Sequence, residues 1–176
     1  MSRVLLIIDM QKFVEQRIQQ GIHFYPSHAI SNMLHVLNRF RTAGEHIIYV
    51  MHRMPEENTV LHQDSSAFPL IESMENKTHE PILFKTTSSA FASTTLEHDL
   101  HALGINEVVV IGAVTGFCVN STVRQGADLG FKMTIVEDAT ISFDVINHNL
   151  TAQQIHATTI GLLAADFATV ISTREL

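Results

Sequence analysis

The sequence predicts an α/β fold: a three-layer sandwich with helices on both faces of a mostly parallel sheet. Two observations carry this prediction. Short, continuous apolar runs are typical of strands buried on both faces, and segments with helical spacing of apolar residues lie between them. Strands and helices therefore alternate along the chain, as they do in parallel α/β proteins. At 176 residues, the chain is long enough for one substantial core, so we expect residues 1–176 to form a single domain.

The first half of the chain contains three apolar runs that predict strands, namely Val4 to Ile8, Ile47 to Met51 and Pro81 to Phe84. Between the first two, apolar residues at helical spacing predict a helix with Ser27 as its N-cap and Gly44 as its C-terminal stop. Residues 52–78 are polar, irregular and interrupted by two prolines. Loops of this length are often functional, and we expect this one to shape a binding pocket.

The second half continues the alternation with three strands and three helices. A helix lined by Leu96, Leu100 and Leu103 ends at Gly104, and further helices are expected from Cys118 to about Gly130 and over residues 151–166. The strands are Val108 to Ile111, Met133 to Val136 and Thr169 to Ser172. We expect the six strands in the order 3-2-1-4-5-6, in which ligands bind at the carboxyl ends where the strand order reverses.

Composition narrows the range of partners. The formal net charge is −7 and the few basic residues are scattered, which argues against nucleic acid and acidic membrane surfaces. A single cysteine excludes an internal disulfide, and no basic segment followed by a long apolar stretch opens the sequence, so we expect a cytoplasmic protein. The chain is 45% hydrophobic and only 16% charged, which favours a homo-oligomer.

Three residues with complementary chemistry fall at carboxyl ends of predicted strands: Asp9, Lys85 and Cys118. Cys118 opens a predicted helix, where unpaired N–H groups and the helix dipole would lower the pKa of the thiol. A nearby carboxylate can take the thiol proton and later return it to a leaving group, and an ammonium can stabilise both anions. The ordinary structural alternatives are a buried small apolar residue for Cys118, a helix cap for Asp9 and a surface charge for Lys85.

Three blocks resemble the signature blocks of the isochorismatase-like cysteine hydrolases, which include nicotinamidases and N-carbamoylsarcosine amidohydrolase. The blocks are VLLIIDMQ, FKTTSSAF followed by TTLEHDLHALGI, and VVVIGAVTGFCVNSTVRQGADLGFKMTIVEDAT. The resemblance spans nearly the whole chain. It implies a catalytic triad of Asp9, Lys85 and Cys118. It also implies a cis peptide between Ala113 and Val114, with the N–H groups of Val114 and Cys118 as oxyanion donors. Homodimers and homotetramers, both frequent in the family, fit the apolar composition.

Departures from the family's patterns narrow the function. Members that act on isochorismate commonly lack the cysteine, so Cys118 favours acyl chemistry. The Asp-x-His metal motif of nicotinamidases is replaced here by VMHRMPEEN, and no three of the eleven histidines lie at ligand spacing with a carboxylate, so we expect no metal and no cofactor. Gly116 stands where many members have an aspartate. We expect the substrate pocket to include Phe13, His52, Phe91, Thr115 and Phe117, although aromatic residues beside a core more often serve packing.

The sequence therefore predicts a hydrolase of a small-molecule, amide-type C–N bond, acting through a thioester on Cys118. One alternative is a vinyl-ether hydrolase of the isochorismatase type, with Asp9 as the acid. A second is a non-catalytic binding or redox-sensing protein that uses Cys118 as an oxidisable thiol.

Overall fold

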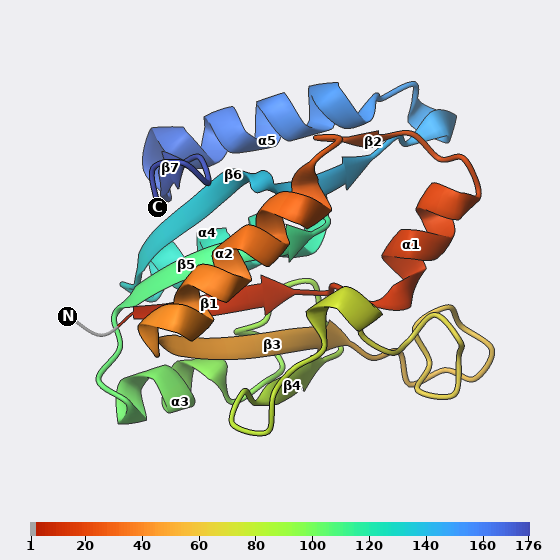
Figure 1. Cartoon of the computed structure of the whole chain (residues 1–176). Helices are drawn as coiled ribbons and strands as arrows, with labels where there is room; N and C mark the ends of the chain where they lie inside the picture. Colours follow the sequence, from red (N-terminus) through yellow and green to blue (C-terminus); the bar gives the residue numbers. More distant parts are fainter. Residues whose placement is uncertain (1–2) are drawn as a thin grey trace.

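The computed structural model describes residues 3–176 and shows a seven-stranded sheet as the middle of three layers (Figure 1). From one edge inward run the parallel strands β4 (Ile82–Lys85), β3 (His46–His52), β1 (Arg3–Ile8), β5 (Glu107–Ala113) and β6 (Lys132–Phe143). Beyond β6 lie the parallel strand β7 (Thr169–Ile171), along its first half, and the antiparallel strand β2 (Phe24–Tyr25), along its second half. The predicted order 3-2-1-4-5-6 is confirmed, with β2 as an additional strand.

Five α-helices in the described part of the chain cover the two faces of the sheet. One face carries α1 (Lys12–Gln19) and α2 (Ala29–Ala43), whose buried side chains pack with alternate residues of β1 and β3. The other face carries α3 (Leu96–Ala102), α4 (Asn120–Asp128) and α5 (Ala152–Asp166). Because the faces of β1 alternate between the two clusters, its entire apolar run is buried, as expected for a central parallel strand.

Besides the additional strand β2, three elements differ from the sequence prediction. Helix α1 was not predicted because its residues are mostly polar and only Val14 is buried. The N-cap of α2 is His28 and not Ser27, since the carbonyl of Pro26 accepts the N–H of Ala29 and closes a turn ahead of the helix. Strand β6 continues to Phe143, well past the predicted end, because the polar pair Glu137 and Asp138 interrupts the apolar pattern without ending the strand.

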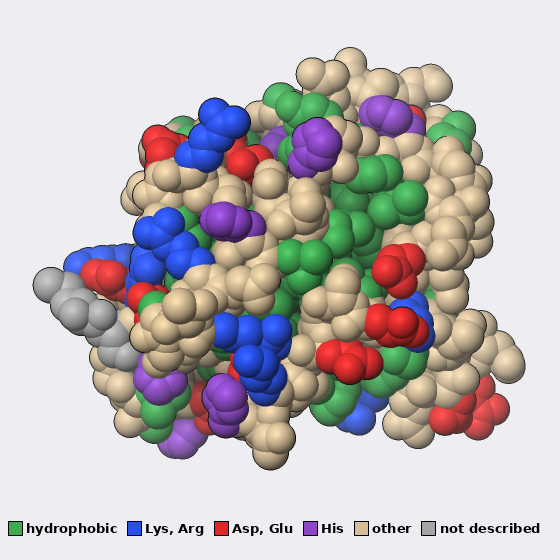
Figure 2. Space-filling view, viewed as in Figure 1, with side chains coloured by type: hydrophobic (Ala, Val, Ile, Leu, Met, Phe, Trp, Pro, Cys, Tyr) green, Lys and Arg blue, Asp and Glu red, His purple; other side chains and the backbone are tan. Residues whose placement is uncertain are grey.

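Residues 53–81 form the irregular connection between β3 and β4, with only a short 3₁₀ turn, η1 (Glu72–Met74). Part of this segment is nevertheless buried, through Ala67, Ile71 and Met74. No helix within residues 3–176 is long and apolar enough to cross a membrane. Figure 2 shows apolar side chains gathered at the surface between α1 and α2.

Candidate active site

The carboxyl ends of three strands bring Asp9, Lys85 and Cys118 together. Asp9 follows β1, Lys85 is the last residue of β4, and Cys118 lies in the turn after β5. The Lys85 Nζ is 2.8 Å from Asp9 Oδ2 and 3.2 Å from Cys118 Sγ. Strand β3 separates β4 from β1, so the long lysine side chain spans that gap past the end of β3. The ammonium is thus the contact that links the carboxylate to the thiol.

Asp9 has an unusual backbone conformation. Its φ is +50°, a left-handed value that few non-glycine residues adopt, although aspartate and asparagine do so more readily than most. The N–H of Asp9 donates to the carbonyl of Val50 at 2.8 Å, which holds this turn against β3. The side chain is almost fully buried, yet Oδ1 has no hydrogen-bond partner among residues 3–176. That buried oxygen is available to accept a proton or a hydrogen bond from a bound molecule.

Lys85 is completely buried and its Nζ has four acceptors within reach. Besides Asp9 and Cys118, these are the Nδ1 of His52 at 2.8 Å and the carbonyl of Thr87 at 3.1 Å. An ammonium has only three N–H bonds, so the four acceptors compete. A buried cation needs such compensation, because burying a charge without partners is very unfavourable.

Cys118 lies in a single π-helical turn, η2 (Thr115–Val119), and α4 begins two residues later. Burial raises the pKa of the Cys118 thiol to about 12, and the negative charge of Asp9 acts in the same direction, while Lys85 opposes both. The expectation that a helix start would lower this pKa is therefore wrong for the free protein. The cysteine is therefore protonated at neutral pH, and any reaction at its sulfur would need a base to take the proton.

Asp9 fits the role of that base. Burial raises the pKa of Asp9 above its ordinary value, although the neighbouring Lys85 pulls it down. A carboxylate of raised pKa is a stronger proton acceptor than an ordinary one, and catalysis is most efficient when this pKa approaches the working pH. The ion pair with Lys85 favours the ionised form of Asp9, against the effect of burial.

Near the end of β5, the backbone at Gly112 lies very close to the backbone of Ile8 in β1. A Cβ on Gly112, whose φ is +122°, would lie 2.2 Å from the carbonyl oxygen of Ile8, so only glycine fits there. The peptide bond that joins Ala113 to Val114 is cis. The next residue, Thr115, is fully buried and its hydroxyl donates to Thr140 Oγ1 at 3.1 Å. These contacts fix the turn that carries Cys118.

The residues predicted to line the substrate pocket differ in burial and in their contacts. Phe117 is 56% exposed beside the thiol, and Phe13 is half-buried on α1. Phe91 is buried and stacks on Phe131 in the core, and Thr115 belongs to the buried hydroxyl pair described above. His52 contacts Lys85 directly.

Gln11 is a site residue that the sequence analysis did not identify. Its side chain is fully buried and forms two hydrogen bonds with the backbone of His52, accepting from N–H at 2.9 Å and donating to the carbonyl at 3.1 Å. A third bond reaches the carbonyl of Phe68 at 2.8 Å. Gln11 thereby ties the end of β1 to the end of β3. A polar residue three positions after a buried strand was the available signal.

Asp9, His52 and Cys118 form the one cluster of metal-ligand side chains found among residues 3–176, with ligand atoms within 4.8 Å of one another. Zinc accepts such a donor set. However, the Lys85 ammonium lies within hydrogen-bond distance of all three side chains and would repel a divalent cation. The absence of a metal stays a prediction.

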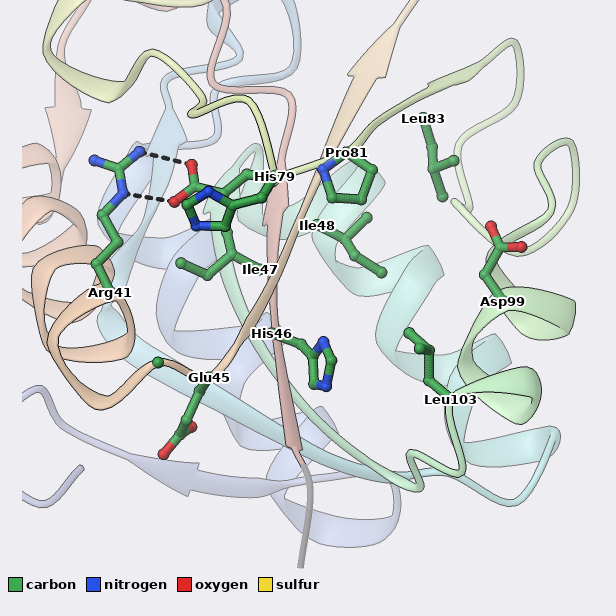
Figure 3. A pocket seen from close by; sticks show the side chains of 12 residues that line it. Arg41, Glu45, His46, Ile47, Ile48, His79, Pro81, Leu83, Asp99 and Leu103 are labelled. Atoms are coloured by element: carbon green, nitrogen blue, oxygen red, sulfur yellow. Dashed lines mark hydrogen bonds and ion pairs between the residues drawn. The ribbon is translucent and has the colours of Figure 1, made fainter.

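One cavity lies beside this site, and another lies at the opposite end of the sheet. One of about 390 Å³ is lined by Gly116, Phe117 and Ile155, next to the turn of Cys118. Another, of about 570 Å³, opens at the opposite end of the sheet, where Arg41 forms a bidentate ion pair with Glu80 (Figure 3). It includes His46, the first residue of β3, about 20 Å along the strand from His52. That cavity is therefore separate from the cluster of Asp9, Lys85 and Cys118.

Comparison with known proteins places this geometry in a family. The family model described as an isochorismatase domain matches residues 3–175. The uncharacterised isochorismatase family protein YrdC of Bacillus subtilis is 30% identical, over 99% of this chain and 94% of that protein. Nicotinamidase 3 of Arabidopsis thaliana is 25% identical, over 98% and 85%. A solved structure of the isochorismatase family from Chromobacterium violaceum superposes with a TM-score of 0.91, at 28% identity, covering 99% of this chain and 91% of that one. The chain belongs to the isochorismatase family.

Proposed function

We propose that this protein is a cysteine hydrolase that cleaves an amide-type C–N bond of a small molecule through a thioester on Cys118. The observation that carries the proposal is the position of Lys85 Nζ, in contact with both Asp9 Oδ2 and Cys118 Sγ in a buried setting. This arrangement provides a nucleophile, a base and a cation without a histidine base. The similarity to a nicotinamidase supports amide chemistry.

In the first half of the reaction, Asp9 takes the thiol proton as Cys118 Sγ bonds to the carbonyl carbon. The electron pair of the C=O bond moves to oxygen, and the N–H groups of Val114 and Cys118 stabilise this oxyanion, a contribution of about 3 kcal/mol per donor. The intermediate then collapses, the C–N bond breaks, and Asp9 returns the proton to the departing nitrogen. An amine or ammonia leaves, and the acyl group remains on sulfur.

In the second half, water attacks the thioester and Asp9 accepts a proton from it. The C–S bond breaks, the carboxylic acid leaves, and the proton returns from Asp9 to sulfur. Lys85 is the charge partner throughout, since it faces the thiolate as it forms and the carboxylate whenever that group is ionised. Neither half needs a cofactor or a metal.

The raised pKa of Cys118 bears on the redox alternative. Redox-sensing cysteines are low in pKa and accessible, whereas this thiol is partly buried and stays protonated. Its reactivity would depend on a bound substrate that engages Asp9. The vinyl-ether route uses Asp9 as acid and does not need sulfur, so a cysteine variant separates it from the thioester route.

The test is turnover of a panel of small primary amides, measured as ammonia release, with isochorismate assayed in parallel. We expect Cys118→Ala and Lys85→Met to lose at least a thousandfold in kcat/KM on any amide that the wild type hydrolyses. Lys132→Met, at an exposed lysine paired with Glu107, is the matched control and retains full activity. Mass spectrometry of the quenched enzyme is expected to show an acyl group on Cys118. Full amide turnover by Cys118→Ala would exclude the nucleophile, and isochorismate turnover by that variant would support the ether route.

The compartment and the assembly also stay proposals. A cytoplasmic homodimer or homotetramer that acts on a small molecule is consistent with the acidic, cysteine-poor sequence.

A further inference from the structure

His52 is held in place by its backbone and aims its ring at Lys85. It is the last residue of β3, in register with Lys85 on β4, and Gln11 bonds to both its N–H and its carbonyl. Its Nδ1 is 2.8 Å from Lys85 Nζ. An ammonium has no lone pair to offer, so Nδ1 must be the acceptor and the ring proton of the neutral imidazole must lie on Nε2.

We propose that His52 is a positioning residue whose unprotonated Nδ1 holds the Lys85 ammonium between Asp9 and Cys118, and whose protonation in acid breaks that contact. The inference rests on the proposed thiol mechanism, because it assigns a function to the position of Lys85. It moves His52 from the substrate pocket, where the sequence placed it, to the support of the catalytic lysine.

Charge explains why the contact depends on protonation. An imidazolium has a proton on Nδ1, so it has no acceptor for Lys85, and two positive charges 2.8 Å apart in a partly buried site repel strongly. The titratable groups that face the ring are Lys85 from β4, Asp9 after β1 and Cys118 from η2. Burial and the Lys85 charge lower the pKa of His52 below its ordinary 6.5, and Asp9 opposes them. The ring is therefore neutral at physiological pH, and the contact is lost only on the acid side of 6.5.

The ammonium loses one of its four acceptors when this happens. Asp9, the carbonyl of Thr87 and Cys118 Sγ remain, so Lys85 is expected to shift among these three, away from the new positive charge. Because Nζ is also the group that faces Cys118 Sγ, the environment of the thiol changes with the protonation of His52. A merely structural histidine would produce no such coupling.

The first readout is the titration of His52 by NMR of the histidine rings, with its signal identified as the one missing from His52→Asn. We expect the wild-type ring to be the Nε2–H tautomer and to titrate below 6.5. In Lys85→Met, the repelling charge is gone and the titration is expected to move up by about one pH unit or more. An unchanged titration in Lys85→Met would overturn the proposal.

The second readout is the rate at which 4,4′-dithiodipyridine, a disulfide that reacts at low pH, modifies Cys118, the only cysteine. We expect the wild-type pH profile to break at the pH where His52 titrates. His52→Asn places an amide oxygen where Nδ1 was, so the variant keeps an acceptor for Lys85. Because the amide does not titrate, we expect the break in the pH profile to be absent. His52→Leu removes the acceptor, and we expect its rate at neutral pH to differ at least threefold from that of the wild type, while His52→Asn stays within twofold. His23→Asn, at an exposed histidine, is the control and keeps the wild-type profile.

A profile with no break in the wild type, or a break that persists in His52→Asn, would contradict the role of His52. Equal rates for the leucine and asparagine variants at neutral pH would do the same. Neither readout needs turnover, so this inference can fail while Cys118 still hydrolyses amides. It can also hold if no amide in the panel is a substrate.

Discussion

At the scale of single residues, the site depends on a buried ion pair. Asp9 and Lys85 are almost completely excluded from water, and their side chains are 2.8 Å apart. Pairs of this kind contribute little net stability, because desolvation offsets the attraction, but removal of one partner leaves an uncompensated buried charge. The carboxylate also has one oxygen without a partner among residues 3–176, which is a further destabilising feature.

We expect Asp9→Asn to lower the free energy of unfolding by about 3 kcal/mol, since it leaves the Lys85 ammonium without a counter-charge. Asparagine tolerates the left-handed backbone at this position, so the change tests charge and not conformation. The double variant Asp9→Asn with Lys85→Met is expected to regain most of the loss. Urea unfolding of the four proteins of this cycle measures the coupling, and strictly additive losses would show that the pair is not coupled.

Cys118 offers a second prediction at this scale. Its pKa of about 12 in the folded protein exceeds the ordinary 9.0, so the native thiolate fraction at mildly alkaline pH is roughly a thousandfold lower than in the unfolded chain. We expect iodoacetamide to alkylate the native protein more than tenfold more slowly than the protein in denaturing urea. Equal rates would mean that the site does not suppress ionisation.

The same difference in pKa has a consequence for stability. Below about pH 9 the thiol is protonated in both states and has no effect, but between pH 9 and 12 the unfolded chain loses this proton while the folded protein keeps it. Stability is therefore expected to fall as the pH rises through this window. Urea unfolding of the wild type and Cys118→Ala across the window isolates the effect, and parallel curves would refute it.

At the scale of elements, the close approach of β1 and β5 brings their following residues together. Gly112 permits this approach because a side chain there would collide with the backbone of Ile8. The packing of Gly112 against Ile8 fixes the start of the turn η2, and the hydrogen bond from Thr115 to Thr140 holds the turn in place. The position of Cys118 relative to Asp9 thus depends on strand packing as much as on the site itself.

Gly112→Ala is expected to destabilise the protein by about 3 kcal/mol or more, because the new methyl group meets rigid backbone at a strained φ. Gly161→Ala is the matched control. It lies in the interior of α5 with open space around it, so the change is expected to stabilise the helix by about 0.5 to 1 kcal/mol. Thermal melting compares the two, and a neutral Gly112→Ala would show that the strands can separate locally.

At the scale of the whole molecule, the central strands followed from the sequence because continuous apolar runs mark buried parallel strands, and their order is the one typical of doubly wound sheets. The same logic failed for β2 and α1, which are short and have little buried surface, and for the second half of β6, where Glu137 and Asp138 break the pattern. The contacts of Gln11 and His52 could not be foreseen, since they join residues 41 positions apart through side-chain orientation. Likewise, the burial that raises the pKa of Cys118 is a property of the packed site.

Assembly is the prediction that belongs to this scale. Several large apolar side chains are well exposed, among them Phe117, Ile146 and Leu162, which favours contact with further copies of the chain. We expect light scattering coupled to size exclusion to give the mass of a dimer or tetramer at micromolar concentration. A monomer under these conditions would contradict the prediction.

The short strands at both edges of the sheet have a consequence for aggregation during folding. Beyond β6 there is no single long strand, because β7 and β2 cover different halves with three and two residues, respectively. The other edge, β4, has four residues, and its Phe84 is stacked on Phe68 and covered by Arg53. Long, flat edge strands are templates for intermolecular β-pairing, and short or covered ones resist it. Both boundaries of this sheet therefore protect a very apolar chain against aggregation.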